Sequence, residues 1–307
     1  MTRSPVSALV DTVSSHHSGP AGYGTLAVMP WVPELFTAPA LERILEKRRR
    51  DALVAVPYFD GLMAGDPDPL VESFSVQPEV HDPVRGRIKG EAAFRAFVIE
   101  TSAWLRKHHA SVEDVEHAIL ERRGFEEVVV HLDTDGGSVS LPVAVVADRR
   151  VDGRINEVRV YFTTQPLTGR HANRPPLLQP DPELPVSDAV AAYVRAFAAG
   201  DVDAVVAAFE PDGYAREPAG GRHVHSGPDG LGRFYERLFS DGVGIPLETC
   251  ALVDDGRVAA LEYNVVQGGA TRQVLQAGVV MFAGGRSGKL AAVRVYDDIE
   301  PPQRPEA

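Results

Sequence analysis

Cysteine is nearly absent from this chain of 307 residues, in which Cys250 is the one example. A disulfide within the chain and a zinc site built on cysteines are therefore excluded. The chain also has no run of about 18 apolar residues, so we expect no membrane-spanning helix, and its first residues lack the apolar core of a signal peptide. Together these absences predict a cytoplasmic protein.

Basic residues are also scarce. The chain has 31 Lys and Arg against 43 Asp and Glu, which gives a formal net charge of -12. Nucleic acids and anionic membranes both select clustered Lys and Arg, so we expect neither as a partner. The one basic run, Lys47 to Arg50, lies between Glu46 and Asp51 and is typical of a solvated helix face.

What the chain does contain is a long internal repeat. The segment from Tyr58 to Asp82 returns without a gap as Tyr193 to Glu217, 135 residues later, and Val158 to Tyr161 returns as Val293 to Tyr296 at the same offset. This period exceeds the roughly 20–50 residues of solenoid and propeller units. Each copy is therefore predicted to be a globular domain with its own core.

In each copy, apolar residues first recur at helical spacing and then alternate as in strands. In the first copy we expect helices over 41–57, 58–65, 69–74 and 91–106, and strands over 79–82, 111–120, 125–132, 138–147 and 155–162. In the second we expect helices over 187–200, 204–209 and 230–239, and strands over 213–217, 247–253, 258–266, 273–282 and 290–296. A further short edge strand is expected at 25–29. Helices followed by a meander predict α+β domains.

The composition divides the chain into five parts. We expect a partly disordered segment over 1–38, a first domain over 39–162, a linker over 163–186, a second domain over 187–300 and a loose tail over 301–307. The linker contains six prolines, including Pro175 and Pro176, and such a segment is semi-rigid.

Three features of the repeat carry a family resemblance. Tyr58 and Tyr193 each stand seven residues before Gly-Asp, Asp82 and Glu217 each precede proline, and each copy ends with Val-Arg-Val-Tyr. Both copies therefore resemble the nuclear transport factor 2-like, or SnoaL-like, superfamily, which includes ketosteroid isomerase, polyketide cyclases and limonene-type epoxide hydrolases. The resemblance implies two cone-shaped domains, each a curved antiparallel sheet packed on about three helices around a pocket.

The resemblance also implies catalytic residues. In ketosteroid isomerase a tyrosine on the first helix helps hold an enolate oxygen, while an aspartate before a proline moves the proton. These roles would fall to Tyr58 and Asp82 in the first copy and to Tyr193 and Glu217 in the second. A buried carboxylate has a raised pKa that suits a general base. The alternatives are a carboxylate that caps the following turn and a tyrosine that fills the core.

Other side chains are candidates for the pocket wall or the core, and two of them would add polar groups if they face inwards. These substrate-binding candidates are Trp104, His131, Tyr235, Glu262 and Tyr263. His223 and His225 alternate along a strand, but no acidic or cysteine ligand follows at a diagnostic interval, so we expect no metal and no other cofactor.

The sequence therefore predicts a cofactor-independent acid/base enzyme for a small, largely apolar molecule, of the isomerase, cyclase or epoxide hydrolase type. The alternative is a non-catalytic module of the same fold that binds a small molecule or serves assembly. We expect the two copies to form an intramolecular pseudo-dimer, and a homodimer of the whole chain is the further arrangement considered.

Overall fold

The computed structural model describes residues 58–172, 174–221, 223–240, 242–267 and 274–299. The helix expected over 41–57, the strand expected over 25–29 and the segments 1–38 and 301–307 lie outside these residues. Among the described residues no helix is both long enough and apolar enough to cross a membrane.

Each half of the described chain begins with two helices, a strand hairpin and a third helix, and a meander of strands follows. The first half contains α2 (Tyr58–Ala64), α3 (Pro67–Glu72), β1 (Glu79–Asp82), β2 (Gly86–Lys89), α4 (Glu91–Lys107), β3 (Ser111–Ile119), β4 (Arg123–Thr134), β5 (Gly137–Arg149) and β6 (Ile155–Tyr161). After α5 (Gln165–Thr168), the second half contains α6 (Asp188–Ala199), α7 (Val202–Ala207), β7 (Phe209–Arg216), β8 (Val224–Ser226), α8 (Gly227–Leu238), β9 (Leu247–Asp254), β10 (Val258–Gln267), β11 (Val274–Gly284) and β12 (Leu290–Tyr296).

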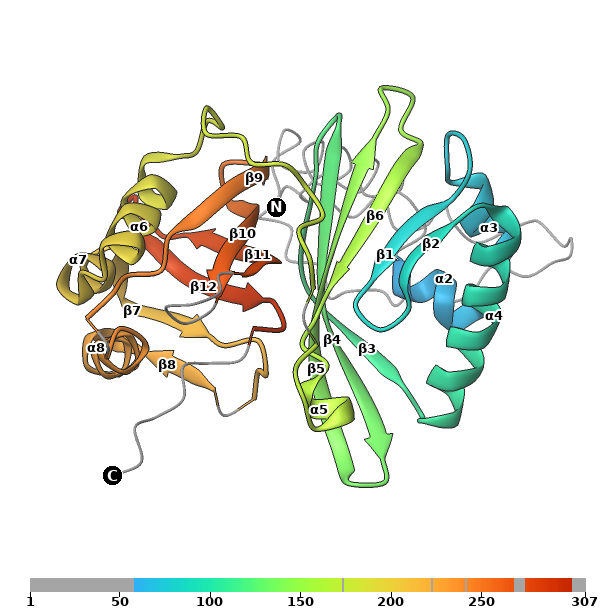
Figure 1. The fold of residues 1–307 in the computed structure, drawn as a ribbon, viewed down its shortest axis with the longest axis horizontal. Helices are drawn as coiled ribbons and strands as arrows, with labels where there is room; N and C mark the ends of the chain where they lie inside the picture. The colour runs from blue at the N-terminus through green and yellow to red at the C-terminus, as the bar shows by residue number, and fades with distance from the viewer. Residues whose placement is uncertain (1–57, 173, 222, 241, 268–273, 300–307) are drawn as a thin grey trace, which may run out of the picture. The chain divides into compact units, whose positions relative to one another are not determined.

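The two sheets have the same strand order. The first runs β2-β1-β6-β5-β4-β3 and the second β8-β7-β12-β11-β10-β9 (Figure 1). The α+β class with two curved-sheet domains is confirmed, with one correction: β1 pairs with β6, and β7 with β12, in parallel. The whole meander separates the members of each parallel pair, so no hairpin forces them to run antiparallel.

The repeated Gly-Asp dipeptide has a structural reason. Gly65 and Gly200 end their helices at positive φ, 73° and 69°, a conformation that favours glycine. Asp66 and Asp201 then cap the next short helices, and the Asp66 carboxylate accepts the backbone N–H of Asp68 at 3.1 Å. These short helices begin two residues earlier than predicted, because helix formation starts directly after the capping aspartate.

Two short strands were missed by the sequence analysis. β2 and β8 each form a hairpin with the preceding strand. Strand β2 has four residues, of which Ile88 alone is buried, and β8 has three. Strands of this length are too short to show a recognisable apolar alternation.

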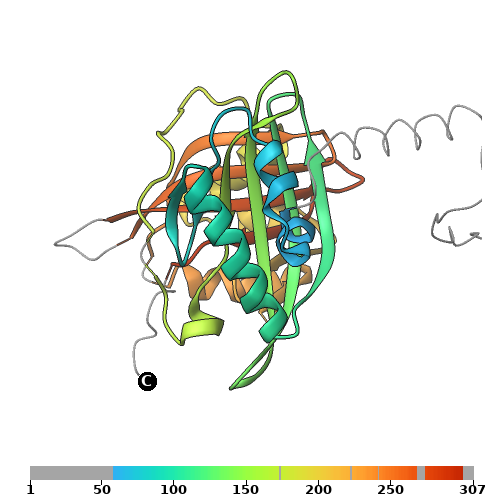
Figure 2. The ribbon, with the colours of Figure 1, turned by 90° about the vertical axis from the view of Figure 1, so that its right-hand side faces the viewer.

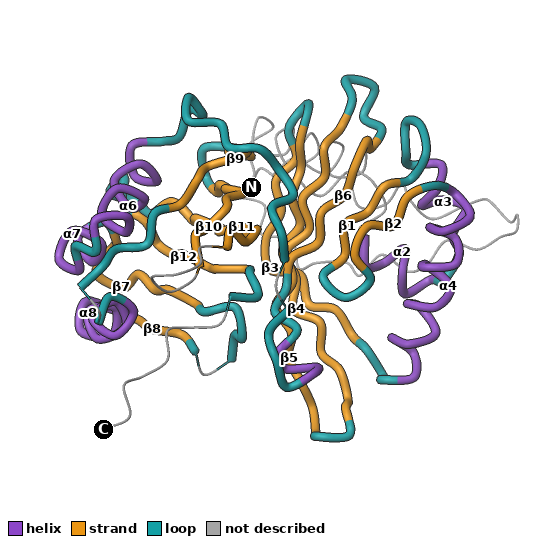
Figure 3. The backbone as a smooth tube through the Cα atoms, in the orientation of Figure 1, coloured by secondary structure: helices purple, strands orange, loops and turns teal. Residues whose placement is uncertain are grey.

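Helices cover one face of each sheet, as Figures 1 and 2 show for α2 to α4 and Figure 3 for α6 to α8. In the first half Phe94, Phe97 and Val98 of α4 are buried in a core that includes Val128 and Val130 of β4. The prediction that Trp104 is also buried is wrong. Trp104 is 39% exposed and its ring lies 4.5 Å from that of His108, because it occupies the outer face of α4.

The other faces of the two sheets contact each other. A shared apolar cluster contains Phe125, Val146 and Tyr161 of the first sheet with Met281 and Tyr296 of the second. Two buried ion pairs cross the same interface. Arg159 donates to Glu262 at 2.6 and 2.9 Å, and Arg294 donates to Glu127 at 2.5 and 2.6 Å. The central parts of β4, β5 and β6 in the first half, and of β10, β11 and β12 in the second, are therefore covered on both faces, by helices on one and by the other sheet on the other.

Candidate functional site

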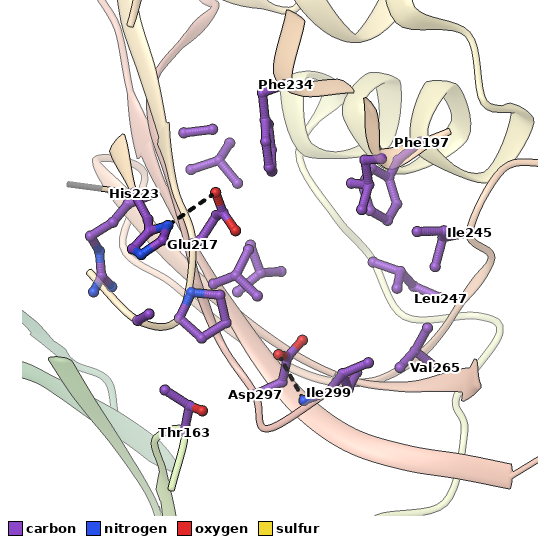
Figure 4. Close-up of a pocket in the computed structure, with 18 of the residues that line it drawn as sticks. Thr163, Phe197, Glu217, His223, Phe234, Ile245, Leu247, Val265, Asp297 and Ile299 are labelled. Carbon is purple, nitrogen blue, oxygen red and sulfur yellow. Dashed lines mark hydrogen bonds and ion pairs between the residues drawn. The ribbon is translucent and has the colours of Figure 1, made fainter. Parts of the chain in front are cut away.

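The second half contains a cavity of about 450 Å³ between its helices and its sheet. This volume is in the range that holds a small organic ligand. Apolar side chains from α6, α8, the α8–β9 segment, β9, β10 and β11 form much of its wall, and they include Phe197, Leu238, Ile245, Leu247, Val265 and Val280. Figure 4 shows the carboxylates of Glu217 and Asp297 pointing into the space that Phe197, Ile245 and Leu247 border on the other side.

Glu217 enters this cavity directly after β7, where Pro218 ends the strand. Its carboxylate accepts a hydrogen bond from Nε2 of His225 at 2.7 Å and lies 3.8 Å from Nδ1 of His223. The His225 ring stacks on Phe234, with 4.3 Å between the ring centroids. His223 precedes β8 and His225 lies within it, and this spacing of two residues brings both rings to one carboxylate.

Tyr193 lies on α6 and is 3% exposed. Its hydroxyl is hydrogen-bonded to that of Tyr235 on α8 at 3.0 Å, and both residues line the cavity. Burial raises the pKa of both phenols above the ordinary value for tyrosine. Both phenols therefore stay protonated near neutral pH, so the pair keeps a hydroxyl hydrogen available for an oxyanion.

A second tyrosine and a carboxylate form a pair at the same cavity. Tyr263 of β10 donates its hydroxyl hydrogen to Oδ2 of Asp297, just beyond β12, at 2.7 Å. Burial raises the pKa of Asp297 to about 6, although the hydrogen bond from Tyr263 acts in the opposite direction. A carboxyl group with this pKa exchanges protons readily near neutral pH.

The structure brings four predicted site residues together in this cavity: Tyr193, Glu217, Tyr235 and Tyr263. Glu262 is not among them. Because side chains alternate along a strand, Tyr263 faces the cavity and Glu262 faces the first sheet, where it also accepts the hydroxyl hydrogen of Tyr161 at 2.7 Å. The prediction of a pocket role for Glu262 is therefore corrected to an interface role.

His131 also faces away from the helices of its half. Its neighbours Val130 and Leu132 lie in the first core, so alternation along β4 turns His131 to the other face. There its side chain is 41% exposed and its ring contacts Ser140 and Glu113, each at 3.0 Å. The expectation that His131 faces a pocket is corrected by these contacts. Trp104, on the outer face of α4, is likewise outside the cavity of the second half.

Asp82, the first-half counterpart of Glu217, holds a turn. Its Oδ1 accepts the backbone N–H groups of Val84 and Arg85, both at 2.8 Å. Burial raises the pKa of Asp82, while these two N–H groups lower it. This is the turn-capping alternative considered from the sequence. Tyr58 is the first residue of α2, and its side chain lies outside the described residues.

One group of side chains in the first half has the spacing of metal ligands. Glu79, His81 and Glu157 place ligand atoms within 4.8 Å of one another. However, Arg87 and Lys89 each approach the Glu79 carboxylate to 2.6 Å, and their positive charges compete with a cation. We therefore assign this group to ion pairing.

Asp297 and His171 are cavity residues that the sequence analysis missed. A signal for Asp297 was present, because Val-Arg-Val-Tyr is followed by Phe162 in the first copy and by Asp297 in the second. A carboxylate at a position that is apolar in the other copy distinguishes the two copies at this point. For His171 the sequence carried no signal, since it lies in the linker that joins the copies.

Comparison with known proteins finds one matching domain family. Residues 190–293 match the SnoaL-like domain family. No curated protein matches the chain. Among solved structures, the epoxide hydrolase/cyclase-like enzyme SalBIII, which has a role in pyran ring formation in the polyether salinomycin, is 20% identical, with a TM-score of 0.31, over 38% of this chain and 91% of its own.

Two bacterial structures give similar values. A proposed polyketide cyclase of Sinorhizobium meliloti is 20% identical, with a TM-score of 0.30, over 36% of this chain and 94% of its own. A protein of Catenulispora acidiphila with a ketosteroid isomerase-like fold, solved with trimethylamine, is 16% identical, with a TM-score of 0.32, over 38% of this chain and 90% of its own. The family match covers residues 190–293 of the second half, and the sheet of the first half has the same strand order as the sheet of the second.

Proposed function

We propose that the chain is a cofactor-independent acid/base enzyme that acts on a small, largely apolar molecule in the cavity of the second half. The observation that carries this proposal is the presence of two carboxylates, Glu217 and Asp297, in one mainly apolar cavity. Isomerisation, cyclisation and epoxide opening all need a base that takes a proton and an acid that returns one.

The geometry supports separate roles for these side chains. Asp297, with a pKa of about 6, is suited to carry the proton, and Tyr263 orients its carboxyl group. Glu217, paired with His225, supplies a second proton-transfer group at another part of the wall. The Tyr193–Tyr235 pair is placed to donate a hydrogen bond to an oxygen that gains negative charge during the reaction.

The two halves differ at the positions that carry this chemistry. At the offset of 135 residues, Tyr263 corresponds to Val128 and Asp297 to Phe162. Val128 is fully buried in the first core, and Phe162 packs against that core. The first half therefore lacks the tyrosine–carboxylate pair, so we assign the activity to the second half.

The paired sheets support an intramolecular pseudo-dimer of the two halves. The ion pairs of the interface are related by the repeat, since Arg159 and Glu127 correspond to Arg294 and Glu262. In a two-fold arrangement each half contributes the same residues to the other, and these two ion pairs follow that pattern. A homodimer of the whole chain stays a prediction, and the molar mass measured by light scattering tests it.

Thermal shift of the full chain against steroid, terpenoid and polyketide-like compounds would identify ligands, because a compound that binds the folded state raises its stability. Compounds that bind would then be incubated with the wild type and with Glu217→Gln, Asp297→Asn and Asp82→Asn, and the products followed by mass spectrometry. We expect Asp297→Asn and Glu217→Gln each to lower turnover at least 100-fold. Asp82→Asn is the matched control and should retain turnover.

A non-catalytic binding module is the second candidate, and one observation favours it. Each carboxylate of the cavity already has a hydrogen-bond partner, His225 for Glu217 and Tyr263 for Asp297, as in a pocket built to hold a ligand. Binding without product, in the wild type and in all three variants, would identify this function. Full turnover by the Asp297→Asn, Glu217→Gln double variant would contradict the acid/base proposal.

A further inference from the structure

The segment that joins the two halves forms part of the cavity wall. Thr163, Gln165 and His171 all line the cavity, although they precede the second half in the sequence. Figure 4 shows Thr163, which comes from the end of the first half, near Asp297. The pocket is therefore not made by the second half alone.

Asp298 anchors this segment. Its side chain is 2% exposed and accepts hydrogen bonds from the hydroxyl groups of Thr163 at 2.7 Å and Thr164 at 2.6 Å, and from the backbone N–H of Ala172 at 2.7 Å. Nδ1 of His171 is the fourth partner, at 3.0 Å from Oδ1. Four partners on one buried carboxylate hold the segment, and the His171 ring, in one position.

The pairing with Asp298 determines which ring nitrogen of His171 is available. A carboxylate accepts hydrogen bonds, so Nδ1, which lies beside it, carries the hydrogen in the neutral ring. Nε2 then has the lone pair and is an acceptor. Since the ring lines the cavity and Nδ1 is occupied, Nε2 is the polar atom that His171 offers to a ligand.

We propose that Nε2 of His171 accepts a hydrogen bond from a hydroxyl group of the ligand, so that the linker selects apolar molecules that carry a hydroxyl group. This inference rests on the cavity assigned in the proposed function and specifies its substrate class. Phe197, Ile245 and Leu247 accommodate the hydrocarbon part, while His171 disfavours analogues without a donor, because such an analogue would cover the half-buried acceptor and leave it unpaired.

A matched pair of probes tests this selection. 2-Naphthol can donate a hydrogen bond, whereas 2-methoxynaphthalene has a similar shape and cannot. Binding of each to the full chain would be measured by calorimetry at the same pH. We expect the wild type to bind 2-naphthol about tenfold more tightly, as one hydrogen bond in a partly buried site implies.

Two variants of His171 distinguish the roles of its two ring nitrogens. In His171→Asn the amide nitrogen can replace Nδ1 beside Asp298, but no atom replaces Nε2, so the preference for 2-naphthol should fall below about threefold. In His171→Gln the longer side chain places an amide oxygen near the position of Nε2, and part of the preference should return. A melting temperature for each variant within a few degrees of the wild type shows that the segment is still in place.

A wild type without a preference, whether it binds both probes or neither, would overturn the proposal. So would a His171→Asn variant that keeps the wild-type preference. Because the measurement reports binding alone, it is independent of turnover. A pocket that selects hydroxyl groups but makes no product would uphold this inference and contradict the proposed enzyme function.

Discussion

Thr163 and Asp298 occupy equivalent positions in the two halves, 135 residues apart, and the hydroxyl group of Thr163 donates a hydrogen bond to Oδ1 of Asp298 at 2.7 Å. Equivalent residues of a two-fold pair can contact each other only near the axis that relates the two copies. The contact therefore supports the proposed pseudo-dimer. It also shows where the halves diverge, since the first has a hydroxyl group and the second a carboxylate at this position.

The first prediction concerns the buried ion pairs between the sheets. Replacing Glu262 by Ala should lower the free energy of unfolding by about 3–5 kcal/mol, because it leaves the Arg159 guanidinium buried without this partner. Replacing both Glu262 and Arg159 by Met should lower the free energy of unfolding by less than the single change does, because no unpaired charge is left between this pair. Urea denaturation measures both values. Glu91→Gln is the control, since the exposed Arg95–Glu91 pair on α4 should contribute no more than about 0.5 kcal/mol.

The second prediction is the pH dependence of the cavity. If Asp297 acts as the base it must be ionised, so kcat/KM should rise with pH around a value near 6, where burial places its pKa. Tyr263→Phe removes a hydrogen bond that lowers this pKa, so the midpoint should move upwards by about one unit. A midpoint that is the same in Tyr263→Phe and the wild type would argue against Asp297 as the titrating group.

The same pKa has a consequence for stability that needs no substrate. Folding raises the pKa of Asp297 from its ordinary 3.8, so its contribution to stability is complete below about pH 4 and is lost as the pH rises through about 6. The loss in the free energy of unfolding should be on the order of 3 kcal/mol. Asp297→Asn should remove this component from the pH dependence of the unfolding free energy, whereas Asp203→Asn, on α7, should leave it unchanged.

The third prediction uses Gly278, which lies opposite Tyr263 in the β10–β11 pairing. A Cβ at Gly278 would come within 2.6 Å of the Tyr263 ring and hydroxyl, so Gly278→Ala should displace this side chain from Asp297. We expect a loss of about 1–3 kcal/mol in stability and a raised midpoint in the pH profile. Gly232→Ala is the matched control. No atom lies near a Cβ at this position of α8, so the substitution should stabilise by up to about 1 kcal/mol.

The fourth prediction compares equivalent valines of the two halves. Val265 lines the cavity, whereas Val130, its counterpart, is 2% exposed in the first core. Phenylalanine at position 265 can extend into the cavity. Val265→Phe should therefore lower the free energy of unfolding by less than about 1 kcal/mol and weaken ligand binding. Val130→Phe should cost about 1–3 kcal/mol through overpacking. Thermal unfolding measures both losses of stability. Equal losses for the two variants would mean that the second half has no more empty space at this position than the first.

Much of the fold was predictable from local patterns. The bounds of β1, β12 and most of α4 follow from apolar periodicity, and the short helices follow from Asp66 and Asp201 as capping residues. The site was predictable where a residue has a fixed place in the repeat, as Tyr193 and Glu217 do. The orientations of Trp104 and His131 were predicted incorrectly, because an isolated aromatic or histidine does not indicate which face of its element is covered.

By itself, the sequence determined that there are two copies of one α+β design and roughly where most of their helices and strands lie, because helix caps, turns and apolar alternation act between near neighbours in the chain. Only the tertiary structure decided that Glu262 pairs with Arg159, that Asp297 joins Tyr263, and that a linker histidine lines the pocket. These contacts join residues that are far apart in sequence. Their positions depend on how the strands pair and how the two sheets pack, which no local pattern specifies.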